Sequence, residues 1–396
     1  MKTVAVLGGG PAGSFAAERL ARAGLKTILI DEKHAWEKPC GGGLTERAYK
    51  QYPFLRDNET AKRTVTETHF AAHDAGTVTL KLRQPLLIYS RFDLNRMLLE
   101  RAEKAGAQIE KTRVMGIERR GSGWTVHTRN SALEADYCVI ATGARNPLRN
   151  VGSEWGPADT MVALGYYVPA DQPHIDIQFL HGLEGYIWIF PRCGHLSVGI
   201  GGKGEPTQSL RKRLERYMDE RSIVYRGAPF FAHVIPSLDT GSWPTNRIAG
   251  DGWMAVGDAA GLVDPITGEG LCYAMRSGDL ASEVMLDERV PAAEKAAVYT
   301  TRIRHEFADD LAYASRLAHR VYMGEFMHDT IPSRMVQFAR YSRRFSHILT
   351  TLIHGGQPYL TLKRKLYGSL LPTLLEMGWN VVIGRREPTE ELTAES

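Results

Sequence analysis

The stretch that decides the fold is residues 3–13, Thr-Val-Ala-Val-Leu-Gly-Gly-Gly-Pro-Ala-Gly, near the N-terminus. Its first five residues form an unbroken β-favouring run, typical of a strand buried on both faces of a parallel sheet. The glycines that follow contain the pattern G-x-G-x-x-G at Gly8, Gly10 and Gly13. Apolar residues then recur at helical spacing over residues 14–23. The order strand, glycine turn, helix predicts a dinucleotide-binding unit.

Each residue of the turn has a physical role in such a unit. Gly8 allows the tight turn, Gly10 lets a pyrophosphate approach the backbone, and Gly13 lets helix and strand pack closely. Pro11 and Ala12 lead into the helix, whose unpaired N–H groups and positive dipole end attract phosphates. We therefore expect these five residues to bind the cofactor.

An acidic residue follows the second strand, at the place where it can accept hydrogen bonds from a ribose diol. Residues 27–30 read as that strand, and Asp31 and Glu32 come directly after it. Asp31 is the first candidate for the ribose contact and Glu32 the competing one. The alternative, a glycine-rich structural turn, is disfavoured because strand, glycines, helix, strand and acid occur in register.

The composition is that of a globular enzyme of two or three structural units, with 43% hydrophobic and 24% charged residues in 396. A net charge of +4 and the lack of a nucleic-acid-binding motif argue against a nucleic-acid partner. Cys40, Cys138, Cys193 and Cys272 are widely spread, so we expect no metal site or disulfide framework and a reducing, cytoplasmic location. Only the polar tail, residues 385–396, has the composition of a disordered segment.

Two later stretches identify the dinucleotide. Residues 137–143, Tyr-Cys-Val-Ile-Ala-Thr-Gly, are a buried strand ending at Thr142 and Gly143, and residues 253–261 deliver Asp258 to a turn of small residues. Both resemble flavoproteins of the p-hydroxybenzoate hydroxylase superfamily. The resemblance implies FAD as the cofactor, bound in part by these three residues. It also implies that Asp258 contacts the ribityl chain and pyrophosphate.

Two more segments resemble the same superfamily. Arg91 opens a helix in an R-x-x-L/F-D pattern, which implies a place near the ribityl-pyrophosphate region; the alternative is an arginine on a solvated helix face. Residues 265–271, Pro-Ile-Thr-Gly-Glu-Gly-Leu, place glycines at another helix start. In the superfamily this turn faces the pyrimidine edge of the flavin. The further cofactor residues expected here are Val114, Gly268, Gly270 and Leu271.

Two motifs resemble the geranylgeranyl reductase family, which shows K-x-C-G-x-G-L and Y-x-W-x-F-P. They are residues 38–44, Lys-Pro-Cys-Gly-Gly-Gly-Leu, and residues 185–191, Gly-Tyr-Ile-Trp-Ile-Phe-Pro. The resemblance extends to about residue 286; one departure is Leu183, where the family often has Pro. It implies reduction of isolated double bonds in polyprenyl chains. The cofactor residues implied in the first motif are Cys40, Gly41, Gly42, Gly43 and Leu44.

Cys40 is the candidate catalytic residue. It stands beside three glycines, which suits a reactive or proton-donating thiol better than a packed core residue. Reduction of an alkene needs a hydride at one carbon and a proton at the other, and a thiol near the flavin could take part in proton delivery. The alternative is that the glycines act through their backbone and the thiol only fills space.

The second motif predicts a substrate-binding surface. On a strand, alternate side chains share one face, so Tyr186, Trp188 and Phe190 form an aromatic row, with Pro191 next to it. Such a row could line an apolar pocket over the flavin, and a row buried in a sheet core is the alternative. The implied substrate is a prenyl lipid or another apolar small molecule.

Other functions remain open at this point. The superfamily also contains aromatic hydroxylases and flavin-dependent halogenases, whose W-x-W-x-I-P motif differs here at Tyr186 and Phe190. A non-enzymatic electron carrier would need no roomy substrate pocket. No second G-x-G-x-x-G unit is recognisable, so the reductant is either transiently bound NAD(P)H or a ferredoxin-like donor.

The assignments predict an α/β fold: a Rossmann-type FAD-binding domain with an inserted, mainly antiparallel β-sheet substrate domain and a helical C-terminal region. In that region, residues 338–349 and 362–375 combine aromatic and leucine side chains with basic ones. Such a pattern fits a helix at a lipid surface, hence peripheral membrane contact, or a helix packed on the FAD-binding domain. The expected FAD-binding domain comprises residues 1–70, 91–162 and 248–286, the substrate-binding domain residues 71–90 and 163–247, and the helical region residues 287–396.

Overall fold

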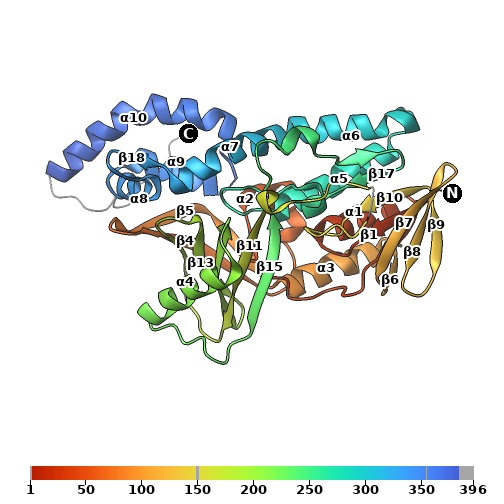
Figure 1. The fold of residues 1–396 in the computed structure, drawn as a ribbon, viewed down its shortest axis with the longest axis horizontal. Helices are drawn as coiled ribbons and strands as arrows, with labels where there is room; N and C mark the ends of the chain where they lie inside the picture. The colour runs from red at the N-terminus through yellow and green to blue at the C-terminus, as the bar shows by residue number, and fades with distance from the viewer. Residues whose placement is uncertain (1, 149–150, 354, 383–396) are drawn as a thin grey trace.

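The computed structural model describes residues 2–148, 151–353 and 355–382. It contains a mostly parallel sheet near the N-terminus, a larger sheet beside it, and helices from the C-terminal third of the chain that cover the larger sheet (Figure 1). This is the predicted α/β class with a second, mainly antiparallel sheet. The polar tail predicted at residues 385–396 lies outside the described residues.

The first sheet carries the predicted Rossmann-type unit. Its strand order is β16-β17-β10-β1-β2-β6, parallel throughout except for β16 at one edge. The strands are β1 (Thr3–Leu7), β2 (Lys26–Ile30), β6 (Gln108–Glu110), β10 (Tyr137–Ile140), β16 (Ala249–Gly250) and β17 (Trp253–Ala255). The helices packed around them are α1 (Pro11–Arg22), α3 (Arg91–Lys104), α5 (Leu271–Leu286) and α6 (Lys295–Ile303).

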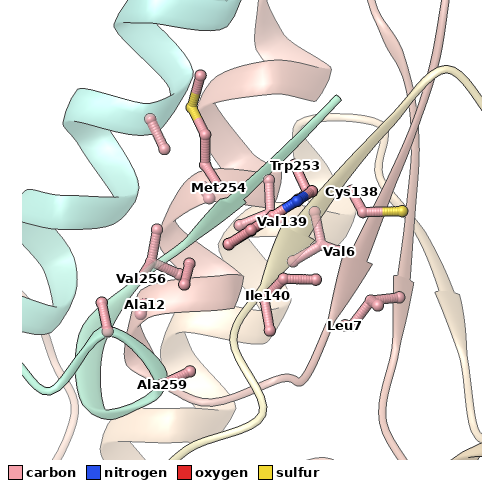
Figure 2. Packing of buried hydrophobic residues seen from close by; sticks show 14 of the residues in the cluster. Val6, Leu7, Ala12, Cys138, Val139, Ile140, Trp253, Met254, Val256 and Ala259 are labelled. Atoms are coloured by element: carbon pink, nitrogen blue, oxygen red, sulfur yellow. The ribbon is translucent and has the colours of Figure 1, made fainter. Parts of the chain in front are cut away.

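The core of this sheet explains why its strands are continuous apolar runs. Val6 is in register with Val139, and Val139 with Met254, so three strands distant in sequence form one layer (Figure 2). All three residues are buried. The strands pack against α1 and against Trp124 and Val126 of a small three-stranded sheet, which join the same hydrophobic core, so no position in these strands requires a polar side chain.

Helix α1 begins at Pro11, three residues before the predicted start, because proline is well suited to the first helical position. The helix approaches β1 so closely that a Cβ on Gly13 would lie 1.9 Å from the carbonyl oxygen of Gly8. Gly8 itself has a φ of +118°, in a region that favours glycine. Glycine is therefore required at both positions by the protein's own backbone.

The second sheet has the order β15-β11-β14-β13-β12-β4-β5-β3. All neighbours are antiparallel except β4 and β12, which are parallel. The predicted boundaries at residues 70 and 162 fall inside β4 and β11, which run in this sheet along their whole length. The strands are β3 (Gly43–Leu44), β4 (Lys62–Ala72), β5 (Gly76–Tyr89), β11 (Thr160–Val168), β12 (Ile175–Phe179), β13 (Glu184–Arg192), β14 (His195–Lys203) and β15 (Phe230–Pro236).

Helices cover both faces of this second sheet (Figure 1). Helix α4 (Thr207–Glu220) packs on one face, against β11 and β14. Helices α8 (Ile331–Tyr341) and α9 (Arg343–Ile353) pack on the other, against β5. The remaining elements are α2 (Glu46–Gln51), α7 (Asp309–Met323), α10 (Tyr359–Val382), a three-stranded sheet of β7 (Val114–Arg120), β8 (Gly123–Thr128) and β9 (Ala132–Ala135), and the hairpin of β18 (Glu325–Phe326) and β19 (Asp329–Thr330).

The apolar residues of α8 and α9 are packing residues. Phe338 and Leu349 are buried, and Leu349 and Phe345 join the hydrophobic cluster of the second sheet. Of the two expectations for this region, the structure therefore shows α8 and α9 as packed helices, with their apolar side chains toward β4 and β5. Within the described ranges, every helix is too short or too polar to cross a bilayer.

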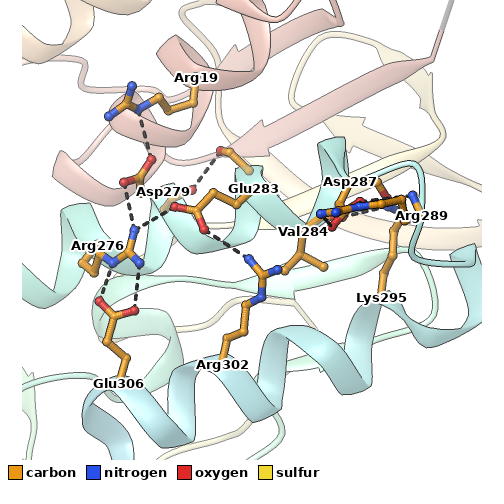
Figure 3. Close-up of polar contacts among 12 residues, drawn as sticks. Arg19, Arg276, Asp279, Glu283, Val284, Asp287, Arg289, Lys295, Arg302 and Glu306 are labelled. Carbon is orange, nitrogen blue, oxygen red and sulfur yellow. Dashed lines mark hydrogen bonds and ion pairs between the residues drawn. The ribbon is translucent and has the colours of Figure 1, made fainter.

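A charged network fixes α5, whose N-terminus begins at the cavity described below. Arg276 binds Glu306 at 2.8 Å, Glu283 at 2.9 Å and Asp279 at 3.0 Å, and Asp279 continues to Arg19 of α1 at 3.0 Å (Figure 3). The network joins α5 to α1 and to the helical segment after α6.

Candidate functional site

A cavity of about 290 Å³ lies where the two sheets and the C-terminal helices meet. At one end it is bordered by glycine turns of the first sheet, including Gly10, Gly143 and Gly268. At the other end its walls are apolar side chains from the second sheet and from α8 and α9. These include Phe70, Met161, Ile175, Ile177, Phe179, Ile235, Met335, Leu349, Leu352 and Ile353.

The glycine end fits the dinucleotide part of FAD. A Cβ on Gly10 would have no protein atom within 4 Å, so the backbone at the start of α1 is open to a ligand. Nε of Arg91 and Oγ1 of Thr142 are buried and have no hydrogen-bond partner among the described residues. Arg91 is only 4% exposed, so it does not lie on a solvated helix face. Polar atoms of this kind are suited to phosphate and ribityl oxygens.

Lys38 and Asp258 connect the cysteine loop to the glycine turns. Nζ of Lys38 lies 2.7 Å from Oδ2 of Asp258. Burial alone would raise the pKa of Asp258, but the charges of Lys38 and Arg91 hold that pKa below its ordinary value. Burial and the nearby Lys38 lower the pKa of His233, which also lines the cavity, to about 4. At neutral pH this site therefore contains an ionised carboxylate and a neutral imidazole.

The two acids after β2 point in different directions. Oδ2 of Asp31 accepts a hydrogen bond from the backbone of Gly9 at 2.6 Å, and Oδ1 accepts one from Lys33 at 2.8 Å. Glu32 is exposed and lies 3.6 Å from Arg129. Asp31 is thus the acid beside the glycine turn, while the contact with a ribose remains a prediction.

The Cys40 loop is held by groups on β13 and β14. Arg192, which is completely buried, donates a hydrogen bond to the carbonyl oxygen of Cys40, and Ser197 donates another at 3.2 Å. Gly42 has a φ of +82°, and a Cβ there would lie 2.1 Å from the carbonyl oxygen of Tyr89. Its N–H lies 3.3 Å from Sγ of Cys40. The loop therefore presents the thiol to the cavity with its backbone fixed.

Glu37 and Arg192 are functional residues that the sequence patterns did not reveal. Glu37 accepts hydrogen bonds from Ser90 at 2.5 Å and from the backbone of Arg91 at 2.9 Å, and it forms an ion pair with Arg192. Burial would raise the pKa of Glu37, but the Arg192 charge and these hydrogen bonds lower it. One carboxylate thus fixes both the start of α3 and the arginine that holds Cys40. The only sign of them in the sequence is their position: Glu37 directly precedes the motif of residues 38–44, and Arg192 directly follows the motif of residues 185–191.

The aromatic row lies on the cavity side of β13. Tyr186, Trp188 and Phe190 line the cavity, whereas Ile187 and Ile189 pack into the cluster on the α4 side. The Phe190 ring lies against the glycine loop, 3.1 Å from the place of a Cβ on Gly41. A larger residue at Gly41 would therefore crowd the ring.

Three tyrosines hold the turn of residues 264–268, which borders the cavity. The hydroxyl of Tyr186 donates to a turn carbonyl at 2.5 Å, Tyr322 donates to another, and Tyr359 donates to Asp264 at 2.8 Å. Asp264 also accepts two backbone N–H bonds within the turn. Burial raises the pKa of the Asp264 carboxyl.

Glu269 is a second ionisable group at this turn, and the sequence analysis did not single it out. It lines the cavity, and its Oε1 accepts a hydrogen bond from the backbone of Cys272 at 2.8 Å, at the start of α5. Burial, with a smaller contribution from Asp264, raises the pKa of Glu269 to about 7. A carboxyl group with this pKa can hold and release a proton near neutrality.

The structure brings most of the predicted site residues to one cavity. Those that line it are Gly10, Pro11, Ala12, Cys40, Gly41, Gly42, Gly43, Arg91, Gly143, Tyr186, Trp188, Phe190, Asp258, Gly268, Gly270 and Leu271. Those outside its lining are Gly8, Gly13, Asp31, Glu32, Leu44, Val114, Thr142 and Pro191. The side chains of Leu44 and Val114 are buried in hydrophobic clusters, so any contact they make with a cofactor would come from the backbone.

The chain matches known protein families over both parts of the site. Residues 1–160 match the FAD binding domain family, and residues 88–281 match the FAD dependent oxidoreductase family. Both matches agree with the glycine end of the cavity, and FAD is the cofactor.

Individual relatives cover most of the chain. Digeranylgeranylglycerophospholipid reductase 2 of Methanothermobacter thermautotrophicus is 31% identical over 71% of this chain and 77% of its own. Menaquinone reductase of Mycobacterium tuberculosis is 29% identical over 84% and 87%. The crystal structure of a geranylgeranyl bacteriochlorophyll reductase-like protein from Thermoplasma acidophilum has the same fold, with a TM-score of 0.76 at 22% identity over 93% of this chain and 99% of that one. The chain belongs to the geranylgeranyl reductase family of FAD-dependent oxidoreductases.

Proposed function

We propose that this protein reduces carbon–carbon double bonds in the polyprenyl chain of a lipid, using electrons carried by its FAD. The observation that carries the proposal is the apolar part of the cavity lining, which the aromatic row shares with side chains of β4, β12 and α9. An apolar chain fits such walls, whereas a polar aromatic acid would leave its polar groups unpaired there. Polyprenyl groups also occur in the names of related reductases.

The residues proposed to hold FAD follow from the geometry of the glycine end. The start of α1 would receive the pyrophosphate, and Arg91 and Asp258 would meet the phosphate and ribityl oxygens. Asp31 would accept hydrogen bonds from the ribose. The turn of residues 264–268 and the Cys40 loop would border the isoalloxazine ring.

Reduction of an isolated alkene requires a hydride at one carbon and a proton at the other. Reduced FAD supplies the hydride. Two groups of the chain border the cavity and can hold the proton, Sγ of Cys40 and the carboxyl group of Glu269, and we propose Cys40 as the donor. The aromatic row excludes water and orients the prenyl chain of the substrate against the glycine loop.

The electron donor is proposed to be NAD(P)H, bound transiently, or a ferredoxin-like protein. The spacing G-x-G-x-x-G recurs at Gly199, Gly201 and Gly204, but the first two lie inside β14. There Gly199 leaves room for the ring of Trp188, 2.3 Å from where a Cβ would be. The glycine at the start of this second pattern therefore makes room for a side chain of the aromatic row.

Peripheral membrane contact is proposed for α10. Leu375 and Trp379 are each 67% exposed, and Leu374 is 39% exposed. They follow an exposed basic run, residues 363–365. Exposed apolar side chains beside cations are typical of a helix at an anionic lipid surface.

A single-turnover experiment tests the proposed reaction. The FAD-loaded protein is reduced chemically without oxygen and mixed with a geranylgeranyl lipid in detergent. We expect the flavin to be reoxidised by the lipid, with two hydrogen atoms gained per reduced double bond by mass spectrometry. If the lipid does not reoxidise the reduced flavin, and the enzyme instead hydroxylates or halogenates an aromatic compound in air, the protein is a hydroxylase or a halogenase.

A further inference from the structure

A cluster of metal-binding side chains lies on the second sheet, on the face opposite the cavity. Glu67 and His69 belong to β4, and His174 and Asp176 lie at the start of the neighbouring β12. The two strands are parallel, and His69 is in register with Asp176. Residues 68 and 70 of β4 line the cavity, so the alternation of a strand turns Glu67 and His69 to the other face.

The four side chains are in direct contact. Nε2 of His69 lies 2.7 Å from Oε1 of Glu67, and Nδ1 of the same ring lies 3.2 Å from Oδ1 of Asp176. Nε2 of His174 lies 3.4 Å from that same Asp176 oxygen. The two imidazole rings are stacked with centroids 3.9 Å apart. Glu67, His69 and His174 each offer one ligand atom, and these three atoms lie within 4.8 Å of one another.

The two ring nitrogens of His69 face one carboxylate each, Glu67 at Nε2 and Asp176 at Nδ1. A metal ion at Nε2 would be bound by both the ring and Glu67, while the other ring nitrogen faces Asp176. A carboxylate that accepts the other ring N–H orients histidine ligands in metalloproteins in the same way.

We propose that Glu67, His69 and His174 bind one divalent transition-metal ion, with Zn²⁺ as the best match to two imidazoles and a carboxylate. Metal–ligand distances are about 2.0–2.2 Å, so the two stacked rings would have to rotate for each to direct a nitrogen at one ion. Asp176 orients the imidazoles from outside the coordination sphere. Gln172 in turn donates a hydrogen bond to Asp176 at 3.1 Å.

The position of the ion gives it a structural role. It would join β4 to β12, the one parallel pair among the described strands of this sheet, from the outer face. Thr68 and Phe70 of β4 and Ile175 and Ile177 of β12 form part of the cavity wall. The bound ion would therefore fix the wall against which the apolar part of the substrate lies.

Metal binding is tested on the full-length, FAD-loaded protein. The background carries Cys193→Ser, because Cys193 is an exposed free thiol and thiolates are good Zn²⁺ ligands. After treatment with a chelator, Zn²⁺ is titrated by calorimetry and Co²⁺ by visible absorption. We expect one ion per chain and a higher unfolding temperature. We expect no Zn²⁺ or Co²⁺ binding in Glu67→Gln, which keeps the shape of the side chain, or in His174→Ala.

Two further variants make the result specific. Asp176→Asn keeps all three ligands, and we expect its affinity to fall about 10- to 100-fold. His73→Ala removes an exposed histidine in the turn after β4, outside the cluster, and should leave binding unchanged. Absence of Zn²⁺ binding, or binding that persists in both Glu67→Gln and His174→Ala, would overturn the proposal.

Discussion

The hydroxyl of Tyr359, at the start of α10, lies 2.8 Å from Oδ2 of Asp264 in the turn that borders the cavity. Both residues are buried. The C-terminal region, where the sequence resemblance has faded, therefore reaches the part of the site proposed to face the flavin. The same turn is also held by Tyr186 of β13 and Tyr322 of α7, so three separate elements fix its position.

Tyr359→Phe should loosen this turn. The buried Asp264 would keep its backbone hydrogen bonds but lose the phenol, which is expected to cost about 1–3 kcal/mol in the free energy of unfolding. We also expect FAD to dissociate faster. Denaturant unfolding and flavin release measure the two effects. Tyr137→Phe, at the start of β10 in the first sheet, is the matched control, and an equal effect of both variants would contradict a positioning role for Tyr359.

Gly10→Val should retain the fold and lose most of its FAD. The backbone at Gly10 has a φ of −71°, which valine accepts, and a Cβ there meets no protein atom. The added side chain would instead occupy the position proposed for the pyrophosphate. Gly13→Val should lose FAD because the fold itself is disturbed. Circular dichroism measures the fold and flavin absorbance measures the bound FAD, so together they separate the two causes, with Gly116→Val as a control. Full FAD occupancy in Gly10→Val would exclude the proposed pyrophosphate site at the start of α1.

Cys40→Ala should leave FAD bound but slow the oxidation of reduced flavin by the lipid, by about 100-fold if the thiol delivers the proton. The loop is held through the Cys40 carbonyl by Arg192 and Ser197, so the substitution spares its backbone. Stopped-flow single turnovers measure the rate, with Cys193→Ser as the control. An unchanged rate would mean that the thiol only fills space.

The pH dependence of turnover should report Glu269. Its pKa of about 7 means that the protonated form predominates below pH 7 and the carboxylate above it. If the protonated form is needed, the single-turnover rate is constant below about pH 7 and falls about tenfold per pH unit above it. Glu269→Gln should remove this break from the profile. A break that persists in the variant would assign it to another group.

Vesicle binding should depend on both charge and apolar contact. We expect the protein to sediment with anionic vesicles at low salt, and less at high salt, because each basic residue near the surface contributes about 1 kcal/mol. Replacing Leu375 and Trp379 with Ser should weaken binding, as should Arg343→Glu with Arg344→Glu. Neutral vesicles are the control. Failure to bind anionic vesicles at low salt would contradict membrane contact.

The sequence by itself determined the features that depend on neighbouring residues. Gly8 and Gly13 are required by the protein's own backbone, and Gly10 by the proposed approach of the pyrophosphate, so their spacing was enough to predict the strand, turn and helix. The aromatic row of Tyr186, Trp188 and Phe190 followed in the same way, because the twofold period of a strand decides which side chains share a face.

Only the tertiary structure decided which distant segments meet. The pairs Glu37–Arg192 and Asp264–Tyr359, and the contact of His69 with His174, each join positions about a hundred residues apart or more. The face covered by α8 and α9 and the pKa of Glu269 likewise depend on packing, through burial and the charges brought nearby. Such contacts leave no periodic pattern in the sequence, because they arise from the order of strands in the sheets rather than from the local backbone.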